Sequence, residues 1–498
     1  MNPVRFSGLI GEAGLRPEAL TGEADVVWIT ADSRACPPGS VFVCMPSRRT
    51  DSHQFLKGAN QAGATACVVH SRKGFEIAAG LGFAVAWIQP DQPSFNEQVG
   101  LLARELLGDP SAQMRVAGVT GTNGKTTTAW MLRDALRALG RRSAYLGTLG
   151  FDTGGTLREI PNTTPFPVET WQLLHEAMEA EVQEFVMEAS SHALAERRPA
   201  GVRFEVGVFT NLSQDHLDFH GTMEQYEDAK LLLFTEFAER AGADFRSAIN
   251  VGDPVGRKWA AESPPTVTFG ALGADLECRA TEVSVDSITL NISFGGDDRE
   301  VRLGVGGQFN VWNADATAAT LLAMGFALGD AVEAMESVTP VPGRFESVQT
   351  SRGFGVIVDY AHTEDALEKL LESARQLGPN RIITVFGCGG DRDRAKRPKM
   401  ARAASEGSDI TIVTSDNPRN EDPLQILHEV EQGLVSGKRS ESMVDRRAAI
   451  QRAIDLAEGG DIVVIAGKGH EDYQVIGDTK HPMDDREMAR EALEALPR

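Results

Sequence analysis

The chain has 498 residues, more than one hydrophobic core usually serves, so its length favours about three domains. Its 49 Lys and Arg against 71 Asp and Glu give a formal net charge of -22, which argues against a broad electrostatic grip on nucleic acid or on an anionic membrane. Hydrophobic residues make up 42% and charged residues 24%, which is typical of a folded globular protein and excludes a mainly disordered chain.

The start of the chain, MNPVRFSGLIGEAGL, has no continuous apolar segment of the kind that directs export, and no later run approaches the roughly 18 apolar residues of a membrane span. We therefore expect a cytoplasmic protein without a membrane partner. Five cysteines without C-x-x-C spacing predict neither a disulfide framework nor a thiolate zinc site, so we interpret them as isolated thiols.

Turn-rich joints divide the sequence into three expected α/β domains. GDPSAQM (108–114) precedes the apolar run RVAGV, and SVTPVPGRFE (337–346) interrupts a helical stretch. These joints predict an N-terminal domain over 1–110, a central domain over 111–340 and a C-terminal domain over 341–498. In the last domain RIITVFG, DITIVT and DIVVIAG alternate with helical segments, which predicts a parallel, doubly wound, Rossmann-like sheet.

A glycine-rich segment, VTGTNGKTTT (119–128), follows the expected strand RVAGV and opens a helix. Glycines allow backbone N–H groups to approach phosphate, Lys125 adds a full positive charge, and the Thr126 hydroxyl can bind Mg²⁺. Valine at 119 stands where the strict pattern has glycine, so this is a variant loop whose first glycine is Gly121. The alternative is a plain glycine-rich turn, but Gly-Lys-Thr-Thr after a buried strand favours a nucleotide site.

The loop TGTNGKTT resembles the ATP site of the Mur ligases, which add amino acids to the peptidoglycan precursor, and of the related folylpolyglutamate synthases. Further matches to the Mur ligases run through all three expected domains. They are DSR (32–34), NTTP (162–165), MEASSHAL (187–194), TNLSQDHLDFHGTMEQYEDAK (210–230), DYAHT (359–363), GCGGDRDRAKRP (387–398), TSDNPR (414–419) and GKGHEDYQ (467–474). Together they are most similar to the Mur ligases that add meso-diaminopimelate.

This resemblance implies an α/β protein of three domains, with a P-loop ATPase domain that has a mostly parallel sheet in the centre and a Rossmann-like, amino-acid-binding domain at the C-terminus. The N-terminal domain would bind the UDP-linked substrate. ATP would activate a carboxylate as an acyl phosphate that an amine attacks, so catalysis would rest on positioning and charge, without a protein nucleophile. The implied nucleotide contacts are Gly121, Thr122, Asn123, Gly124, Lys125, Thr126, Thr127, Asn313, Arg344 and Asp359.

The resemblance also implies Mg²⁺, with Thr126, Glu188, His216 and Lys230 as the metal site, and with Lys125 completing the catalytic set. Lys230 would be carbamylated by CO₂, which turns a cation into an oxygen ligand. The residues alone leave other interpretations open. Glu188 could belong to a helix-capping segment and His216 could be a surface or capping residue. Lys230 could form an ion pair with Glu227 or pack its stem on the side of Tyr226.

For substrates the resemblance implies UDP-N-acetylmuramoyl-L-alanyl-D-glutamate and meso-diaminopimelate. The implied contacts to the UDP-linked substrate are Ala31, Ser33, Arg48, Arg49, Thr50, Asn162, Thr163, Thr164, Ser190 and Arg198, where a one-residue slip to Arg197 stays open. Those to diaminopimelate are Arg392, Asp416, Asn417, Pro418, Arg419, Gly467 and Glu471. Arg419 would grip the distal carboxylate, which lysine lacks. We expect a monomer that binds small molecules and no nucleic acid.

Three other functions are weighed against this one. A lysine-adding Mur ligase is opposed chiefly by Arg419, and a folylpolyglutamate synthase by the extra N-terminal domain and the DNPR motif. A P-loop nucleotide switch would use hydrolysis to change partners, but the chain has no basic nucleic-acid stripe and no Asn-Lys-x-Asp element.

Overall fold

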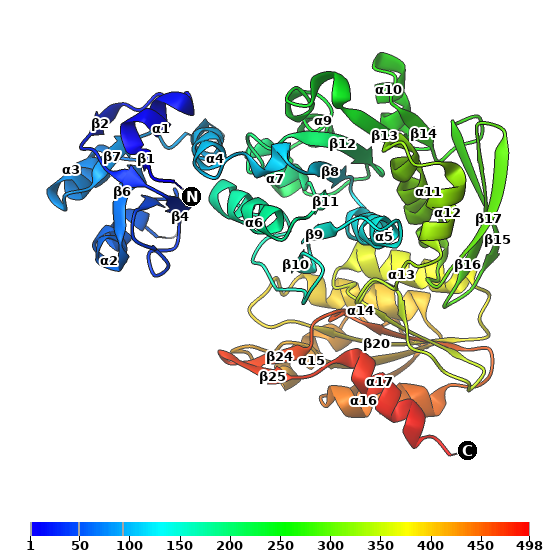
Figure 1. Cartoon of the computed structure of the whole chain (residues 1–498). Helices are drawn as coiled ribbons and strands as arrows, with labels where there is room; N and C mark the ends of the chain where they lie inside the picture. The colour runs from blue at the N-terminus through cyan, green and yellow to red at the C-terminus, as the bar shows by residue number, and fades with distance from the viewer. Residues whose placement is uncertain (1, 48–49, 92–93, 498) are drawn as a thin grey trace. The chain divides into compact units, whose positions relative to one another are not determined.

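The computed structural model describes residues 2–47, 50–91 and 94–497. By its internal contacts the chain forms two compact units, one of Met1–Asp275 with Ala316–Ala327 and the other of Leu276–Asp315 with Leu328–Arg498. Three sheets, each mainly parallel, follow one another along the chain (Figure 1), and this confirms the α/β fold class. The boundaries at 110 and 340 stay predictions.

The first sheet belongs to the N-terminal part of the first unit. Its strand order is β2, β7, β6, β5, β4, and all neighbours pair in parallel except β2 with β7. The strands are β2 (Ala19–Thr21), β4 (Trp28–Thr30), β5 (Ser40–Val43), β6 (Ala64–Val69) and β7 (Ala84–Trp87), and the helices are α1 (Phe6–Glu12), α2 (Leu56–Ala62), α3 (Arg72–Gly80) and α4 (Ser94–Leu106). A short ladder joins β1 (Val4–Arg5) to β3 (Asp25–Val26). The inner strands are nearly continuous apolar runs, as expected for a parallel sheet covered on both faces.

The second sheet, also in the first unit, has the order β10, β9, β11, β8, β12, β13, β14 and is parallel except for β10. Its strands are β8 (Arg115–Thr120), β9 (Ser143–Gly147), β10 (Gly150–Asp152), β11 (Glu184–Glu188), β12 (Phe204–Phe209), β13 (Arg246–Asn250) and β14 (Val267–Phe269). Its helices are α5 (Lys125–Ala138), α6 (Pro167–Glu179), α7 (Ser191–Ala195), α8 (Leu217–His220), α9 (Met223–Leu231) and α10 (Pro254–Glu262). The expected strand at 115–119 and the helix after the glycine-rich loop are confirmed as β8 and α5.

An antiparallel sheet that the sequence analysis did not foresee opens the second unit. It consists of β15 (Leu276–Val283), β16 (Ile288–Phe294) and β17 (Asp297–Leu303). In β16 the buried residues Ile288, Leu290 and Ile292 alternate with more exposed ones, so the sheet has one covered face. After it come α11 (Gln308–Ala323), which crosses the division at Asp315, and α12 (Leu328–Met335).

The last sheet, in the second unit, has the order β18, β19, β23, β20, β21, β22 and is parallel except for β18. Its strands are β18 (Glu346–Ser347), β19 (Gly355–Asp359), β20 (Ile382–Cys388), β21 (Ile410–Ser415), β22 (Arg439–Met443) and β23 (Ile462–Ala466). Its helices are α13 (Glu364–Gln376), α14 (Lys396–Gly407), α15 (Pro423–Glu431), α16 (Arg446–Leu456) and α17 (Asp485–Ala495), and a hairpin of β24 (Tyr473–Ile476) and β25 (Thr479–Pro482) follows β23.

Side chains of this last sheet alternate between two separate apolar cores. Ile357 packs with α13, α14 and α15, whereas Val356 and Val358 pack with α16 and α17. Helices therefore cover both faces of the sheet (Figure 1), and the predicted doubly wound arrangement is confirmed. The first core also includes Val285 and Phe309, which come from the segment Leu276–Asp315.

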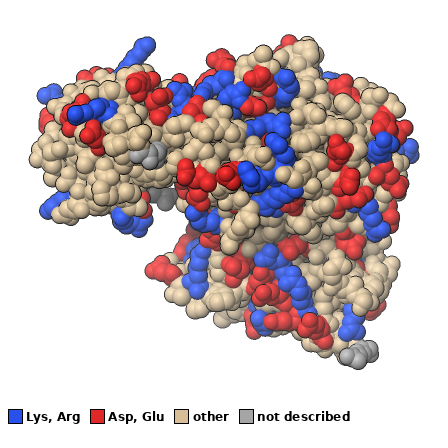
Figure 2. Space-filling model, in the orientation of Figure 1, with Lys and Arg blue, Asp and Glu red and all other residues tan. Residues whose placement is uncertain are grey.

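The surface carries both signs of charge (Figure 2), and the cysteines form no disulfide among the described residues. On the face drawn in Figure 2, Lys and Arg side chains lie among Asp and Glu side chains. In the part of the chain that the structure describes, no helix is both long enough and apolar enough to cross a bilayer. The five cysteines are free, as expected: Cys36, Cys44, Cys67, Cys278 and Cys388.

Candidate active site

The glycine-rich loop lies where four neighbouring strands of the second sheet end, β9, β11, β8 and β12. The backbone makes glycine necessary at two positions. Gly121 has a φ of 149° and a Cβ there would lie 1.9 Å from Thr210 Oγ1, while Gly124 has a φ of 84° immediately before α5. The loop thus reaches the N-terminus of a 14-residue helix, where free N–H groups favour phosphate.

Polar residues after β12 hold this loop in place. Thr210 Oγ1 donates to the Asn123 carbonyl at 2.6 Å, and the Asn123 N–H donates to Asn211 Oδ1 at 3.0 Å. Lys125 Nζ donates to the carbonyls of Gly121 and Thr122 at 2.9 Å each, so its ammonium group lies over the loop. The sequence analysis missed Thr210 and Asn211 as supports; a polar pair directly after a buried strand was the available signal.

Glu188, at the end of β11, is the centre of a buried hydrogen-bond cluster. Its side chain accepts from Thr126 Oγ1 at 2.9 Å, from Tyr145 Oη at 2.7 Å, and from Thr148 N–H at 2.8 Å and Thr148 Oγ1 at 3.2 Å. It is 1% exposed. A buried carboxylate beside the hydroxyl oxygen of Thr126 fits Mg²⁺ as a ligand set. Tyr145 and Thr148 were not anticipated.

The side chain of Lys230, on α9, reaches the glycine-rich loop. It is 1% exposed, its Nζ donates to the Gly121 carbonyl at 2.7 Å, and it lies 4.4 Å from the centre of the Tyr226 ring. The alternative ion pair with Glu227 does not form, because Glu227 pairs with Lys258 at 2.8 Å. Burial, and then repulsion from Lys125, hold the pKa of Lys230 well below its usual range.

His216 lies immediately before α8, with a φ of 52°, and belongs to a group of aromatic rings beside Lys230. Its ring centre lies 4.8 Å from that of His192 and 6.0 Å from that of Tyr226. Partial burial lowers the pKa of His216, which favours the neutral imidazole that a metal requires. His220 is buried in the same group, and its Nε2 lies 3.0 Å from Ser191 Oγ. Neither His192 nor His220 was singled out from the sequence.

The residues expected to hold the peptide end of the UDP-linked substrate meet beside Glu188. Thr164 Oγ1 donates to the Glu188 carbonyl at 2.7 Å and lies 3.3 Å from Ser190 Oγ, and Thr163 Oγ1 lies 3.2 Å from Thr148 Oγ1. Arg198 Nη1 donates to the Thr164 carbonyl at 3.0 Å.

Arg197 turns instead to Glu236, 2.6 Å away, so of the two adjacent arginines Arg198 is the one that reaches this cluster. Asn162 is half-buried next to Thr163.

In the N-terminal sheet the expected contacts follow β4 and β5, which are neighbours. Ala31 and Thr50 are exposed and Ser33 is half-buried. Arg48 and Arg49 lie outside the described residues, so their predicted contacts stay predictions.

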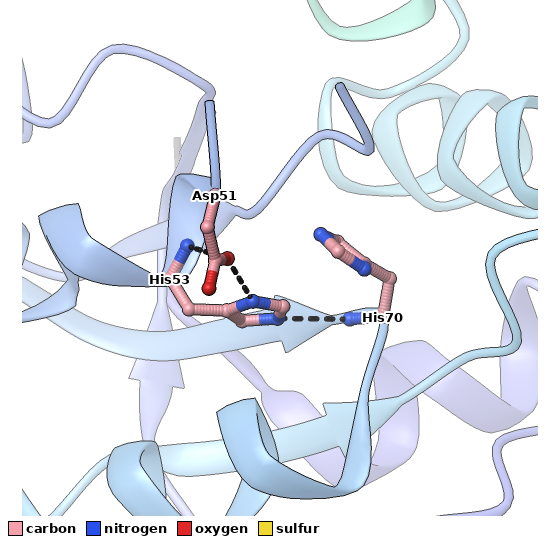
Figure 3. A group of neighbouring side chains, drawn as sticks. All are labelled: Asp51, His53 and His70. Carbon is pink, nitrogen blue, oxygen red and sulfur yellow. Dashed lines mark hydrogen bonds and ion pairs between the residues drawn. The ribbon is translucent and has the colours of Figure 1, made fainter. Parts of the chain in front are cut away.

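Directly after Thr50, Asp51 and His53 form a group with His70, the residue that follows β6 (Figure 3). Asp51 Oδ1 lies 2.6 Å from His53 Nδ1, and the His70 N–H donates to His53 Nε2 at 3.4 Å. Both nitrogens of the buried His53 ring therefore have a polar partner. We interpret the group as a structural contact that fixes the segment after Thr50.

In the second unit, Asp359 ends β19 and accepts from the N–H groups of Phe345 at 2.7 Å and Ala361 at 2.8 Å. Burial raises the pKa of this carboxyl, against the opposing charge of Arg344. Arg344 lies 5.1 Å from the centre of the Tyr360 ring, and Asn313 on α11 donates to Asn310 Oδ1 at 2.9 Å. The roles of Asn313, Arg344 and Asp359 toward ATP stay predictions.

The expected amino-acid contacts gather where β23, β20 and β21 end, three neighbouring strands of the last sheet. Such strand ends bind ligands in open α/β sheets. Arg419, which has a φ of 51°, donates from Nη1 to the Gly390 carbonyl at 2.8 Å, and Asn417 Nδ2 donates to Glu471 Oε2 at 2.9 Å.

A Cβ at Gly467 would lie 3.0 Å from Asp416 Oδ2, so the expected residues after β21 and β23 are in close contact. Arg392 is exposed after β20, and Pro418 is buried in the loop before Arg419. The buried Lys468 was not anticipated here.

These groups supply what carboxylate activation needs. A loop of N–H groups with Lys125 can neutralise phosphate, Thr126 and Glu188 can hold a hard cation, and a separate cluster offers a guanidinium and a carboxylate to an amino acid. We therefore compared the chain with known proteins.

Two family models match, the Mur ligase middle domain over residues 119–321 and the Mur ligase, glutamate ligase domain over residues 343–469. A UDP-N-acetylmuramoyl-L-alanyl-D-glutamate--2,6-diaminopimelate ligase of Gloeobacter violaceus is 42% identical over 495 residues, covering 99% of each chain. The enzyme of the same name from Geobacillus thermodenitrificans is 39% identical over 479 residues, 95% of this chain and 96% of the relative.

Among solved structures, one of a diaminopimelate ligase of that name is 33% identical with a TM-score of 0.68, covering 99% of both chains. The folylpolyglutamate synthase of Mycobacterium tuberculosis is 18% identical with a TM-score of 0.60, covering 80% of this chain and 96% of that one, and so shares the fold alone. The matched domains and the full-length relatives establish that the chain belongs to the Mur ligase family, whose members are ATP-dependent amide ligases.

Proposed function

We propose that this chain joins meso-diaminopimelate to the D-glutamate of UDP-N-acetylmuramoyl-L-alanyl-D-glutamate with the cleavage of ATP, a step in peptidoglycan precursor synthesis. The observation that carries the proposal is the cluster of opposite charges at the ends of β20, β21 and β23, where Arg419 and Glu471 lie on adjacent loops. Relatives that are 39% and 42% identical over nearly the whole chain bear the name of this activity.

In the first chemical step an oxygen of the substrate carboxylate attacks the γ-phosphorus of ATP, and ADP leaves. Lys125 and the loop N–H groups offset the charge of the transferring phosphoryl group, and Arg198 with Thr164 and Ser190 holds the peptide end in line. Asn162 and Thr163 would contact the same end. Thr126, Glu188, His216 and Lys230 would hold Mg²⁺, which supplies further charge neutralisation when bound.

Lys230 can fill its role in the metal site only as an anion. A buried amine with a lowered pKa is available in its neutral form to take up CO₂, and the resulting carbamate would carry a negative charge beside Lys125. This chemistry would place oxygen ligands where an ammonium group would repel Mg²⁺.

In the second step the amine of the incoming amino acid attacks the acyl carbon and inorganic phosphate leaves. Arg419 and Arg392 would pair with the distal carboxylate, while Glu471 and the Gly467 region would receive the distal ammonium group. Lysine lacks that carboxylate and would leave a guanidinium group unpaired, a loss that discriminates more strongly than size.

The test is phosphate release by the purified protein with ATP, Mg²⁺ and the UDP-linked dipeptide, with meso-diaminopimelate and L-lysine compared as amines. We expect strong preference for diaminopimelate. Equal or better use of lysine would support the ligase activity but reject the proposed specificity for diaminopimelate. Nucleotide hydrolysis that ignores the UDP-linked substrate would instead favour a nucleotide switch. Since ATP, the UDP-linked dipeptide and diaminopimelate are all water-soluble, we propose that the protein acts in the cytoplasm. We further propose that it is a monomer.

A further inference from the structure

A lysine that is fully buried lies under the proposed amino-acid site. Lys468 follows Gly467 at the end of β23, and its side chain is 0% exposed. Its Nζ donates to Asn417 Oδ1 at 3.2 Å and to Glu471 Oε2 at 3.1 Å. Because Lys is rarely buried unless it is paired, these two acceptors account for its position.

Asn417 completes a closed ring of contacts with these two residues. Its Nδ2 donates to Glu471 Oε2 at 2.9 Å, while its Oδ1 accepts from Lys468 and also from the Val475 N–H at 2.8 Å. An amide flipped end for end would turn its NH₂ group toward the ammonium group of Lys468, so the ring fixes one orientation. The hairpin strand β24 thereby anchors the loop before Arg419.

Glu471 is held through one oxygen alone. Both donors, Asn417 Nδ2 and Lys468 Nζ, reach Oε2, and among the described residues these two are the side chains that bond to the Glu471 carboxylate. The Glu471 side chain is 19% exposed, so its second oxygen can meet a ligand. A carboxylate oxygen in this setting suits an ammonium group.

We propose that Lys468 is a positioning residue for the amino-acid substrate: it fixes Oε2 of Glu471 and the Asn417 amide so that Oε1 of Glu471 receives the distal ammonium group. The proposal rests on the proposed function, and it deepens the assignment of Glu471. Lys468 touches no reacting atom, so its loss should weaken use of the amino acid more than it slows the bound complex.

The test is steady-state kinetics of Lys468→Met, which keeps the apolar stem and removes the ammonium group. We expect the KM for meso-diaminopimelate to rise about 10- to 100-fold, because a misplaced contact of this kind costs roughly that factor, with kcat changed less than about threefold. The KM for the UDP-linked dipeptide should stay within about twofold. Lys468→Arg, which keeps a cation and donors, should recover most of the loss.

A second comparison separates positioning from general damage. In a Glu471→Gln background, Lys468→Met should change the KM for diaminopimelate by less than about twofold, because both changes act through one carboxylate. This pair also serves if Lys468→Met alone does not fold. Lys369→Met, at an exposed ion pair with Asp365, is the matched control and should behave like the wild type.

An unchanged KM in Lys468→Met, a further large rise in the Glu471→Gln background, or an Arg variant as poor as the Met variant would overturn the proposal. A wild-type protein that does not use diaminopimelate would reject the proposed function itself. The two failures are therefore distinguishable.

Discussion

We expect the proposed phosphoryl transfer to depend most directly on the charge of Lys125. Its ammonium group lies over the carbonyls of the glycine-rich loop, where the γ-phosphate would bind. We expect Lys125→Ala to lower phosphate release by at least about 10²- to 10³-fold, the usual cost of losing one charge-stabilising donor. Lys258→Ala removes an exposed lysine that pairs with Glu227, away from the glycine-rich loop, and as the control should keep wild-type turnover.

Arg419 sets the expected amino-acid preference. Arg419→Ala and Arg419→Lys should both weaken use of diaminopimelate, because a lysine cannot form the two parallel hydrogen bonds that a guanidinium offers a carboxylate. Measured as kcat/KM for diaminopimelate, the loss should be about 10- to 100-fold, with ATP kinetics little changed. If neither variant alters diaminopimelate kinetics, the specificity assignment is wrong.

His220 gives the fold a dependence on pH. Burial, and then the nearby His192, lower the pKa of His220 to about 4, against about 6.5 in an unfolded chain. A base with a lowered folded-state pKa stabilises the fold above its unfolded pKa, and this contribution is lost as pH falls from about 6.5 through 4.

The free energy of unfolding of the wild type should therefore drop by about 1–2 kcal/mol more than that of His220→Gln between pH 7.5 and pH 5. Denaturant titrations of both proteins at the two pH values measure this difference. Parallel declines would show that His220 is not held neutral.

Sequence motifs predicted the residues that lie within them, but not the residues that join the site only when the chain folds. Lys125, Thr126 and Glu188 could be found from a loop and a strand end. Tyr145 and Thr148 could not, because their role depends on β9 lying beside β11, a pairing that no local pattern specifies.

At the scale of elements, a buried ion pair connects the starts of α16 and α17. Arg446 and Asp485 are each 0% exposed and lie 2.6 Å apart, and Arg446 Nη2 also donates to the Ala466 carbonyl at the end of β23 at 3.0 Å. Asp485→Ala would leave a buried cation without a partner, and we expect it to cost about 3–5 kcal/mol of unfolding free energy.

Denaturant titration checks this cost. Glu491→Ala is the matched control, because its partner Arg447 lies on the exposed side of the same two helices, and it should cost only about 0–1 kcal/mol. Equal losses in the two variants would contradict the difference in burial.

Strands were predictable from the sequence where they are almost entirely apolar. The strands of the last sheet are continuous apolar runs and were expected, whereas β15 and β17 carry many charged residues and were not. In β17 only Val301 and Leu303 are buried, so the alternation that marks a half-covered strand is short.

At the scale of the whole molecule, the two compact units should unfold as separable steps. The glycine-rich loop belongs to the first unit, and the loops around Arg419 belong to the second. We expect ADP with Mg²⁺, at about 100 times its Kd, to stabilise chiefly the first unit, by about 2.7 kcal/mol, because the glycine-rich loop lies there, and diaminopimelate to act on the second. Differential scanning calorimetry should show ligand-specific shifts of two transitions; a single transition moved alike by both ligands would contradict this.

The path of the chain constrains how relatives can be recombined. The backbone passes from one unit to the other after Asp275, Asp315 and Ala327, and Phe309 packs edge-on against Phe345 with ring centres 5.1 Å apart. A chimera that exchanged residues 341–498 alone would separate these evolved partners. If the proposed amino-acid site is correct, a transplant of amino-acid preference between ligases should therefore carry Leu276–Asp315 together with Leu328–Arg498, two separate stretches of sequence.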